Sequence, residues 1–188
     1  MEQTVETKSK RNFAESVKET IKFVIISIAI VVPFRMWVAQ PFIVSGASME
    51  PNFKSGDYLI IDELTYKFKE PERGEVIIIK APGGSVFYIK RIVGLPYEKI
   101  EIKQNKVFIS QMGNGGEFEL KENYINGADT YPDGVYKLKE KEYLVFGDNR
   151  PRSLDSREFG PIAKNSIIGK VLLRLWPING LGFAGKIN

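Results

Sequence analysis

The sequence predicts a mainly β, antiparallel domain that follows one N-terminal transmembrane helix. The first observation is the apolar run FVIISIAIVVPF at residues 23–34, which is bounded by Lys22 and Arg35. The second is a change of periodicity from Asp57 onward, where short runs rich in Ile, Val, Tyr and Phe alternate with Gly, Pro and Asn. A long apolar run is typical of a membrane or signal segment, and short runs between turn residues are typical of strands.

The apolar run is short for a membrane span, but its flanks extend it. Twelve helical residues rise about 18 Å, whereas a hydrocarbon core is roughly 30 Å thick. Lys22 and Arg35 can extend toward the headgroups, so that residues 21–38 form a span of about 27 Å with Trp37 at an interface. The alternative is a cleaved signal peptide, but the small-x-small pattern at residues 45–47 lies too far beyond the run for normal processing.

Basic residues before the apolar run predict its orientation. The residues concerned are Lys8, Lys10, Arg11, Lys18 and Lys22. The positive-inside rule keeps such residues in the cytoplasm. The chain is therefore expected to have a cytoplasmic tail at residues 1–20, a transmembrane helix at 21–38 and an extracytoplasmic β domain at 39–188.

Seven strands are expected in the β domain, because each run is rich in β-branched and aromatic residues and is bounded by turn residues. They are Tyr58 to Asp62, Glu75 to Lys80, Val86 to Val93, Lys99 to Lys103, Val107 to Ser110, Glu142 to Phe146 and Ile167 to Leu175. Gln104 and Asn105 separate two alternating runs and predict a hairpin turn. Turn residues are dense at 113–116 and 126–134, so an excursion from the main sheet is expected around 104–140.

Composition excludes several classes of function. The formal net charge is +4 and the basic residues are dispersed, which argues against nucleic-acid binding. The absence of cysteine excludes disulfides, thiolate catalysis and cysteine zinc sites, and the absence of histidine leaves only oxygen ligands for a metal. We therefore expect no metal and no cofactor.

Ser48 is the first candidate for chemistry. It lies in the segment SGASMEP at residues 45–51, where small neighbours allow a substrate backbone to approach closely and a proline fixes the exit from the turn. A serine nucleophile needs a group that accepts its proton, and without histidine that group must be a lysine or a carboxylate. Most serines in such a segment are ordinary loop residues, so Ser48 alone does not establish catalysis.

Lys90 is the candidate base. Strand alternation places Tyr88, Lys90 and Ile92 on one face of the predicted strand at 86–93, and both faces of this strand are mostly apolar. A lysine in this position either extends its amine to water or is partly buried. Burial would lower its pKa from about 10.4, and only the neutral amine can accept the proton of Ser48.

The third candidate segment is GDNRPRSLDSR at residues 147–157. Its density of charges is compatible with an ordinary polar loop that contains ion pairs. It is equally compatible with a shell around an active lysine, in which Ser153 binds the amine and Asp155 pairs with Arg157. The loop alone does not distinguish these two interpretations.

Together the three segments are specific. Ser-Met-x-Pro lies at residues 48–51, Tyr-x-Lys-Arg-x-x-Gly-Leu-Pro at 88–96, and Gly-Asp-Asn-Arg-x-x-Ser-x-Asp-Ser-Arg at 147–157. In this order they resemble the bacterial type I signal peptidases, or leader peptidases, which are Ser/Lys-dyad serine endopeptidases of family S26. The resemblance extends from the apolar segment to about Trp176. It implies the antiparallel β fold that these enzymes share with the self-cleaving repressor proteases of the SOS response.

The resemblance implies a role for each motif residue. The nucleophile falls on Ser48, the general base on Lys90, and the serine that supports the base on Ser153. The residues that brace the last motif fall on Asp148, Asn149, Arg150, Asp155 and Arg157. The backbone N–H of Ser48 would help to form the oxyanion hole, to which some members add a serine hydroxyl at the position of Gly46. A backbone donor or water is expected to serve here instead, since a lost donor costs about 2.7 to 4 kcal/mol.

Substrates of this family lie extended beside the strand before the nucleophile and place small side chains in shallow apolar pockets. By position, those pockets would be lined by Phe42, Val44, Met49, Phe53, Tyr88 and Ile89. The implied activity is removal of signal peptides from exported preproteins after small-x-small sequences such as Ala-x-Ala. The implied partners are these preproteins, the lipid bilayer and the secretion translocase, and the implied location is the bacterial plasma membrane.

Three alternatives belong to other classes. A self-cleaving SOS repressor carries a DNA-binding domain, whereas this N-terminus is an apolar segment flanked by lysines. An inactive membrane-anchored homologue that serves as a binding module would be indicated by loss of Ser48 or Lys90, and both residues are present. The eukaryotic and archaeal-like signal peptidases use histidine as the base, and the absence of histidine excludes them.

Overall fold

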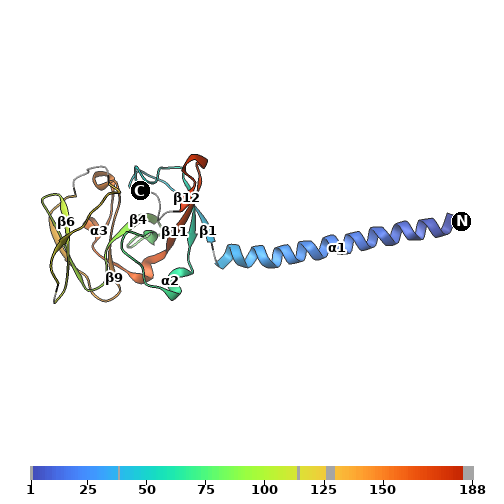
Figure 1. Cartoon of the computed structure of the whole chain (residues 1–188), viewed down its shortest axis with the longest axis horizontal. Coiled ribbons are helices and arrows are strands. Elements are labelled where there is room, and N and C mark those ends of the chain that lie inside the picture. Colours follow the sequence, from blue (N-terminus) through green and yellow to red (C-terminus); the bar gives the residue numbers. More distant parts are fainter. Residues whose placement is uncertain (1, 38, 114, 126–129, 184–188) are drawn as a thin grey trace. The chain divides into compact units, whose positions relative to one another are not determined.

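The computed structural model describes residues 2–37, 39–113, 115–125 and 130–183 of the chain. The chain divides into two compact units, residues 1–39 and 40–188. The first unit contains α1, a continuous helix over Glu2–Trp37 (Figure 1). This segment lacks glycine, and its only proline, Pro33, lies near its end, so that no strong helix breaker interrupts it.

The large apolar side chains that the structure describes between residues 21 and 32 of α1 are exposed. Phe23 is 71% exposed, Ile25 is 60% exposed and Ile30 is 65% exposed. The apolar run has a charged residue at each end. Among the residues that the structure describes, no helix is both long and apolar enough to cross a membrane. The predicted transmembrane helix at 21–38 is therefore not supported.

The second unit is a mainly β, antiparallel domain, as predicted. In the part of the chain that the structure describes, its main sheet has eight strands in the order β1-β2-β11-β3-β4-β9-β10, with β12 paired to β11. The strands are β1 (Ala39–Ile43), β2 (Tyr58–Asp62), β3 (Val76–Lys80), β4 (Phe87–Gly94), β9 (Glu142–Phe146), β10 (Ile162–Ala163), β11 (Ile167–Trp176) and β12 (Gly182–Phe183). This order brings β4 between β3 and β9, at the interior of the sheet.

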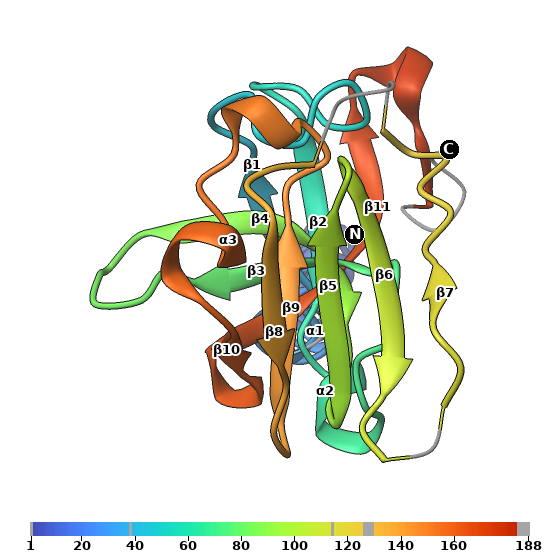
Figure 2. The same cartoon turned by 90° about the vertical axis from the view of Figure 1, so that its left-hand side faces the viewer.

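A second sheet has the order β7-β6-β5-β8 and stands in front of the main sheet in Figure 2. Its strands are β5 (Glu98–Lys103), β6 (Lys106–Gln111), β7 (Phe118–Glu119) and β8 (Gly134–Lys137). The predicted excursion around 104–140 contains β6, β7 and β8. Gln104 and Asn105 have φ angles of 51° and 62° and join two paired residues, Lys103 and Lys106, which confirms the hairpin turn.

The remaining helices are short. They are α2 (Thr65–Phe68), α3 (Ser156–Phe159) and the 3₁₀ turns η1 (Arg150–Arg152), η2 (Lys164–Ser166) and η3 (Ile178–Gly180). α3 begins after Asp155, whose side chain accepts a hydrogen bond from the N–H of Arg157. This capping interaction fixes the end of the loop that follows β9.

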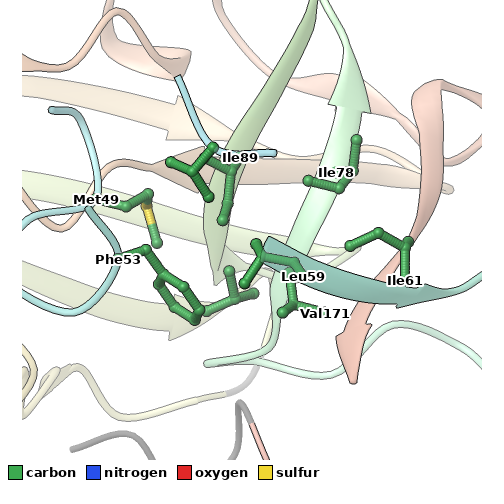
Figure 3. Close-up of a cluster of buried hydrophobic side chains, with 9 residues drawn as sticks. Met49, Phe53, Leu59, Ile61, Ile78, Ile89 and Val171 are labelled. Carbon is green, nitrogen blue, oxygen red and sulfur yellow. The ribbon is translucent and has the colours of Figure 1, made fainter. Parts of the chain in front are cut away.

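Strand alternation divides the core into three clusters. One cluster lies on one face of the main sheet and includes Met49, Phe53, Leu59, Ile78 and Ile89 (Figure 3). Another contains Ile77, Ile79, Ile92, Tyr143 and Val145, and the third contains Val93, Ile100, Ile109 and Phe146. The third cluster draws on strands of both sheets and so joins them. Ile89 and Ile92 belong to different clusters, which confirms the predicted alternation along β4.

The seven predicted strands are confirmed, each with ends within one residue of the observed ones. The short strands β1, β7, β8, β10 and β12 were not predicted. β1 lies at the edge of the main sheet and contains Pro41, a residue that interior strands exclude. The other four have only two to four residues, too few to establish an alternating pattern.

Candidate active site

Ser48 and Lys90 lie in contact although they are distant in sequence. Lys90 Nζ donates a hydrogen bond to Ser48 Oγ at 2.8 Å. Ser48 lies in the turn that follows β1, and Lys90 lies within β4 opposite Ile77 of β3. The turn supplies a reachable hydroxyl, and the interior strand supplies an amine with little freedom to move.

Lys90 is buried, with only 2% of the residue exposed. Burial lowers the pKa of its amine to about 8, because a charged group loses its hydration there, while the negative charges of Asp155 and Asp148 act in the opposite direction. Among the described residues, no carboxylate forms an ion pair with Lys90. The ring of Tyr88 lies 5.3 Å from Nζ and covers one side of the amine. The site therefore favours the neutral amine, which is the form that can accept a proton.

The turn that carries Ser48 is held by the loop after β9. The backbone N–H of Asn149 donates to the carbonyl of Ser48 at 2.9 Å, and its side-chain Nδ2 donates to the carbonyl of Ala47 at 3.0 Å. Two consecutive carbonyls of the turn are thus bound by a single residue. Asn149 belongs to the predicted supporting loop, and the structure brings it directly against the turn of the candidate nucleophile.

Gly147 allows this close approach. A Cβ atom at this position would lie 2.2 Å from Ser153 Oγ and 2.4 Å from the carbonyl oxygen of Ser48. Neither distance is sterically possible, so only glycine fits. The hydroxyl of Ser153 is buried and has no hydrogen-bond partner among the described residues. The predicted contact between Ser153 and the amine of Lys90 is not formed in this structure.

Asp155 and Arg157 form a bidentate ion pair, as their spacing suggested. Arg157 Nε donates to Asp155 Oδ1 at 2.8 Å, and Arg157 Nη2 donates to Asp155 Oδ2 at 2.9 Å. Asp155 also accepts the backbone N–H of Gly147 at 3.0 Å. Because the carboxylate is fully buried, these donors are needed to compensate its charge. The pair closes the loop on itself between its first and last residues.

Asp148 is a second buried carboxylate and binds Arg91 in the same bidentate manner. Arg91 Nε donates to Oδ1 at 2.8 Å, and Arg91 Nη2 donates to Oδ2 at 2.7 Å. Asn52 Nδ2 adds a hydrogen bond to Oδ2 at 2.8 Å. Asp148 therefore links the turn after Ser48 to β4 and to the loop after β9.

Arg150 is buried, and its guanidinium binds side chains that lie outside the three motifs. Its Nε donates to the carbonyl of Gly147 at 3.1 Å, and its guanidinium binds both carboxylate oxygens of Glu122. It also donates to the hydroxyl of Thr130. A loop that is distant in sequence thus supplies the counter-charge of this arginine.

A pocket of about 90 Å³ opens beside Ser48 and Lys90. It is lined by Phe42, Ile43, Val44, Ser45, Ser48, Leu59, Ile78, Phe87, Tyr88, Ile89 and Lys90. Four of the six predicted pocket residues are in this lining. The other two, Met49 and Phe53, are instead buried in the adjoining core cluster (Figure 3). The rings of Phe42 and Phe87 meet edge to face at 5.7 Å.

Gly46 precedes the candidate nucleophile by two residues and has a φ angle of +97°. A Cβ atom at this position would meet no atom within 4 Å. Space is therefore available for a side chain, and the left-handed backbone is what favours glycine. The position offers no side-chain hydroxyl to a developing oxyanion.

Sequence reasoning did not single out four residues that complete this network: Asn52, Arg91, Glu122 and Thr130. Asn52 directly follows the motif at 48–51 and Arg91 belongs to the motif at 88–96, and those positions were a usable signal. Glu122 and Thr130 lie in the predicted excursion, where no local pattern relates them to Arg150. Within the described part of the chain, no group of three or more acidic residues is arranged to hold a metal ion.

Comparison with known proteins relates the chain to one family. Residues 17–176 match the family model described as signal peptidase, peptidase S26. A probable signal peptidase I-2 from Synechocystis is 33% identical over 167 residues, covering 86% of this chain and 74% of the relative. Signal peptidase I from Leptolyngbya laminosa is 34% identical over 175 residues, covering 89% and 83%. A solved signal peptidase I from Enterococcus faecalis is 30% identical, with a TM-score of 0.46, covering 55% of this chain and 97% of that chain.

Proposed function

This chain belongs to the signal peptidase family, peptidase S26, and we propose that it removes signal peptides from exported preproteins by a Ser48–Lys90 dyad. It is accordingly a serine peptidase of the signal peptidase I type. The observation that carries the proposed dyad is the 2.8 Å hydrogen bond between Lys90 Nζ and Ser48 Oγ.

In the proposed mechanism, the neutral amine of Lys90 accepts the proton of Ser48 as Oγ attacks the scissile carbonyl. The resulting ammonium then protonates the leaving amine, and the C–N bond breaks to leave an acyl ester on Ser48. Water attacks this ester, Lys90 accepts the proton of the water, and the proton returns to Oγ as the ester bond breaks. One amine thus serves as base and acid in both halves of the reaction.

The lowered pKa makes this role chemically accessible at neutral pH. With a pKa of about 8, roughly a tenth of the Lys90 amines are neutral at pH 7. With the ordinary value of 10.5, the neutral fraction would be roughly 300-fold smaller. Burial therefore supports the choice of Lys90 as the base of an enzyme that contains no histidine.

We further propose that the apolar pocket selects small side chains next to the scissile bond. Its lining by Phe42, Leu59 and Ile78 is apolar, which suits small uncharged groups such as the methyl of alanine. The pocket adjoins Ser48, so that a substrate side chain held there would lie close to the attacking Oγ. This supports cleavage after small-x-small sequences.

The supporting roles of the last motif follow from the same proposal. Asn149 would fix the carbonyls that flank the nucleophile, and the pairs of Asp155 with Arg157 and of Asp148 with Arg91 would hold the loop in place. The unpartnered hydroxyl of Ser153 is free to bind the Lys90 amine in the working enzyme. The backbone N–H of Ser48, with water, is the proposed oxyanion donor, since Gly46 has no hydroxyl.

We propose in addition that α1 attaches the enzyme to the lipid bilayer. Its exposed apolar residues, such as Phe23 and Ile30, have no protein surface over them among the described residues. Substrates of this class are held in the membrane by their own signal peptides. Attachment of enzyme and substrate to one surface would raise their effective concentration.

The test is cleavage of a purified preprotein with an Ala-x-Ala site by the detergent-solubilised full chain, with sequencing of the new N-terminus. Ser48→Ala and Lys90→Met are each expected to lower kcat by at least about 10³-fold, because each removes a member of the dyad. In the wild type, kcat/KM should fall tenfold per pH unit below about 8, as Lys90 becomes protonated. Undiminished cleavage by either variant would exclude the dyad, and Lys54→Met, an exposed substitution, is the matched control.

A further inference from the structure

The connection between β7 and β8 contacts residues that belong to two of the motifs and a residue that directly follows the third. We call its described residues, 120–125 and 130–133, the strap. Both the strap and the loop after β9 lie toward the upper end of the molecule in Figure 2. The motif residues bind one another, as described above. The strap binds them in addition, although it belongs to none of the motifs.

The strap meets the nucleophile turn and β4 through Tyr124. Its carbonyl accepts a hydrogen bond from Asn52 Nδ2 at 2.6 Å, and its ring stacks under the guanidinium of Arg91 at 4.1 Å. Asn52 follows Ser48 by four residues, and Arg91 follows Lys90 directly. One tyrosine therefore touches the segments that carry both members of the dyad.

The strap meets the loop after β9 through Glu122, Thr130 and Tyr131. The carboxylate of Glu122 accepts two hydrogen bonds from the guanidinium of Arg150, and the hydroxyl of Thr130 accepts a third. The carbonyl of Tyr131 accepts a hydrogen bond from Arg157 at 2.6 Å. Glu122 also accepts the hydroxyl of Tyr124 at 2.6 Å, and so joins the two halves of the network.

Glu122 is the only carboxylate of the strap in contact with Arg150 among the described residues, and the pair is deeply buried. The side chain of Arg150 is 0% exposed and that of Glu122 is 7% exposed. An arginine cannot lose its proton, so a buried guanidinium needs a counter-charge. From Arg150 the path to the dyad is short: Nε binds the carbonyl of Gly147, which lies so near the carbonyl of Ser48 that a Cβ atom would not fit between them.

We propose that Glu122 is a positioning residue of the active site, which acts through Arg150 on the loop that holds Ser48 beside Lys90. This inference rests on the proposed function. Without the carboxylate, Arg150 turns toward water and its hydrogen bond to the carbonyl of Gly147 is lost. Gly147 then no longer fixes the position of the turn that carries Ser48. Displacement of a nucleophile by about 1 Å costs up to roughly 100-fold in rate, even when the altered residue is remote.

The experiment compares Glu122→Gln with Glu119→Gln in the full chain. Glutamine keeps an oxygen for Tyr124 and loses the charge, whereas Glu119 pairs with Lys106 at the exposed surface of the second sheet. We expect Glu122→Gln to lower kcat for preprotein cleavage by about tenfold or more, with KM within about twofold because the pocket is unchanged. Glu119→Gln should match the wild type. Equal kcat values for the two variants would overturn the proposal.

A second readout does not depend on cleavage. The Lys90 amine is titrated by NMR in protein labelled at the lysine Cε carbon, with Lys90→Met for assignment. In Glu122→Gln the loosened loop admits water, and the titration of Lys90 moves toward the ordinary value of lysine. If the wild type fails to cleave preproteins but this shift occurs, the proposed function is wrong and the positioning role stands. If cleavage occurs and neither kcat nor the titration changes, the positioning role alone is wrong.

Two further variants separate positioning from general destabilisation. Thr130→Val removes the hydroxyl that accepts a hydrogen bond from Arg150. It is the variant to use if Glu122→Gln does not fold, and kcat is expected to fall about threefold. In a double-mutant cycle, Glu122→Gln and Arg150→Lys should be strongly non-additive in kcat, because they act on one path. A lowered melting temperature with additive effects on kcat contradicts the proposal.

Discussion

Lys90 and Arg91 are consecutive basic residues of β4. They lie on opposite faces of the strand, and their environments differ in whether a carboxylate balances the charge. Both are buried, at 2% and 6% exposure. Arg91 meets a bidentate carboxylate from Asp148, a carbonyl from Gly74 and the ring of Tyr124. Lys90 meets the hydroxyl of Ser48 and no carboxylate within ion-pair distance among the described residues.

The two residues differ in whether burial leaves them charged. An arginine remains charged at any physiological pH, so burial of Arg91 requires full compensation. A lysine can lose its proton, and burial of Lys90 without a counter-charge makes the neutral form available. Alternation along the strand allows both environments within two residues. The Asp148–Arg91 pair should therefore stabilise the fold. Burial of Lys90 should lower the stability of the fold and, in the proposed mechanism, make its amine available as a base.

The largest expected effect on stability comes from breaking the buried ion pair between Asp148 and Arg91. Asp148→Asn leaves the guanidinium of Arg91 buried without its counter-charge, and should lower the free energy of unfolding by about 3 to 5 kcal/mol. Urea denaturation followed by circular dichroism measures this. Asp133→Asn, at an exposed position, is the control and should change stability by less than about 0.5 kcal/mol. Equal midpoints for the two variants would show that the Arg91 face is not held by charge pairing.

The next effect has the opposite sign. The folded pKa of Lys90 is depressed to about 8 from 10.5, so between these values the unfolded chain binds more protons and stability rises with pH. The buried amine therefore costs about 3 kcal/mol of stability at pH 7 and less than about 1 kcal/mol at pH 10. Lys90→Met removes that cost and loses the hydrogen bond to Ser48, so it should gain about 2 kcal/mol at pH 7.

The pH dependence distinguishes this cause from better packing of methionine. Urea denaturation of wild type and Lys90→Met at pH 7 and pH 10 gives the two differences in unfolding free energy. The gain should nearly disappear at pH 10, where the unfolded lysine also begins to lose its proton. A gain of equal size at both pH values would attribute it to packing, and a loss at pH 7 would show that Lys90 is compensated after all.

The main sheet could be predicted from sequence because its strands carry local signals. Tyr58–Asp62 and Glu142–Phe146 were predicted with their observed ends, since apolar runs bounded by turn residues specify strands locally. β1 could not be predicted, because it is short and contains Pro41, which argues against a strand unless the strand lies at a sheet edge. The sheet order, in which β11 lies between β2 and β3, is equally invisible to a local pattern.

The candidate site could be predicted in part for a related reason. Ser48, Lys90 and the loop at 147–157 carry motifs, and the contact between the first two follows once the motifs are recognised. The brace of Arg150 by Glu122 joins segments whose proximity depends on the whole fold. Met49 and Phe53 were assigned to the pocket by position, but their place in the core depends on which way the turn faces.

The smallest expected effect on stability comes from an exposed ion pair, whose charges need no partner because water already solvates them. Lys106 pairs with Glu119 on the second sheet, with side chains 54% and 46% exposed. Water already solvates both charges, so a double-mutant cycle of Lys106→Ala and Glu119→Ala should give a coupling of less than about 0.5 kcal/mol. This coupling should vanish in 1 M salt, where the Debye length falls to about 3 Å, whereas the cost of Asp148→Asn should persist. If the coupling between Lys106 and Glu119 were as large as the cost of Asp148→Asn, burial would not explain why the Asp148–Arg91 pair matters more to stability than a surface pair.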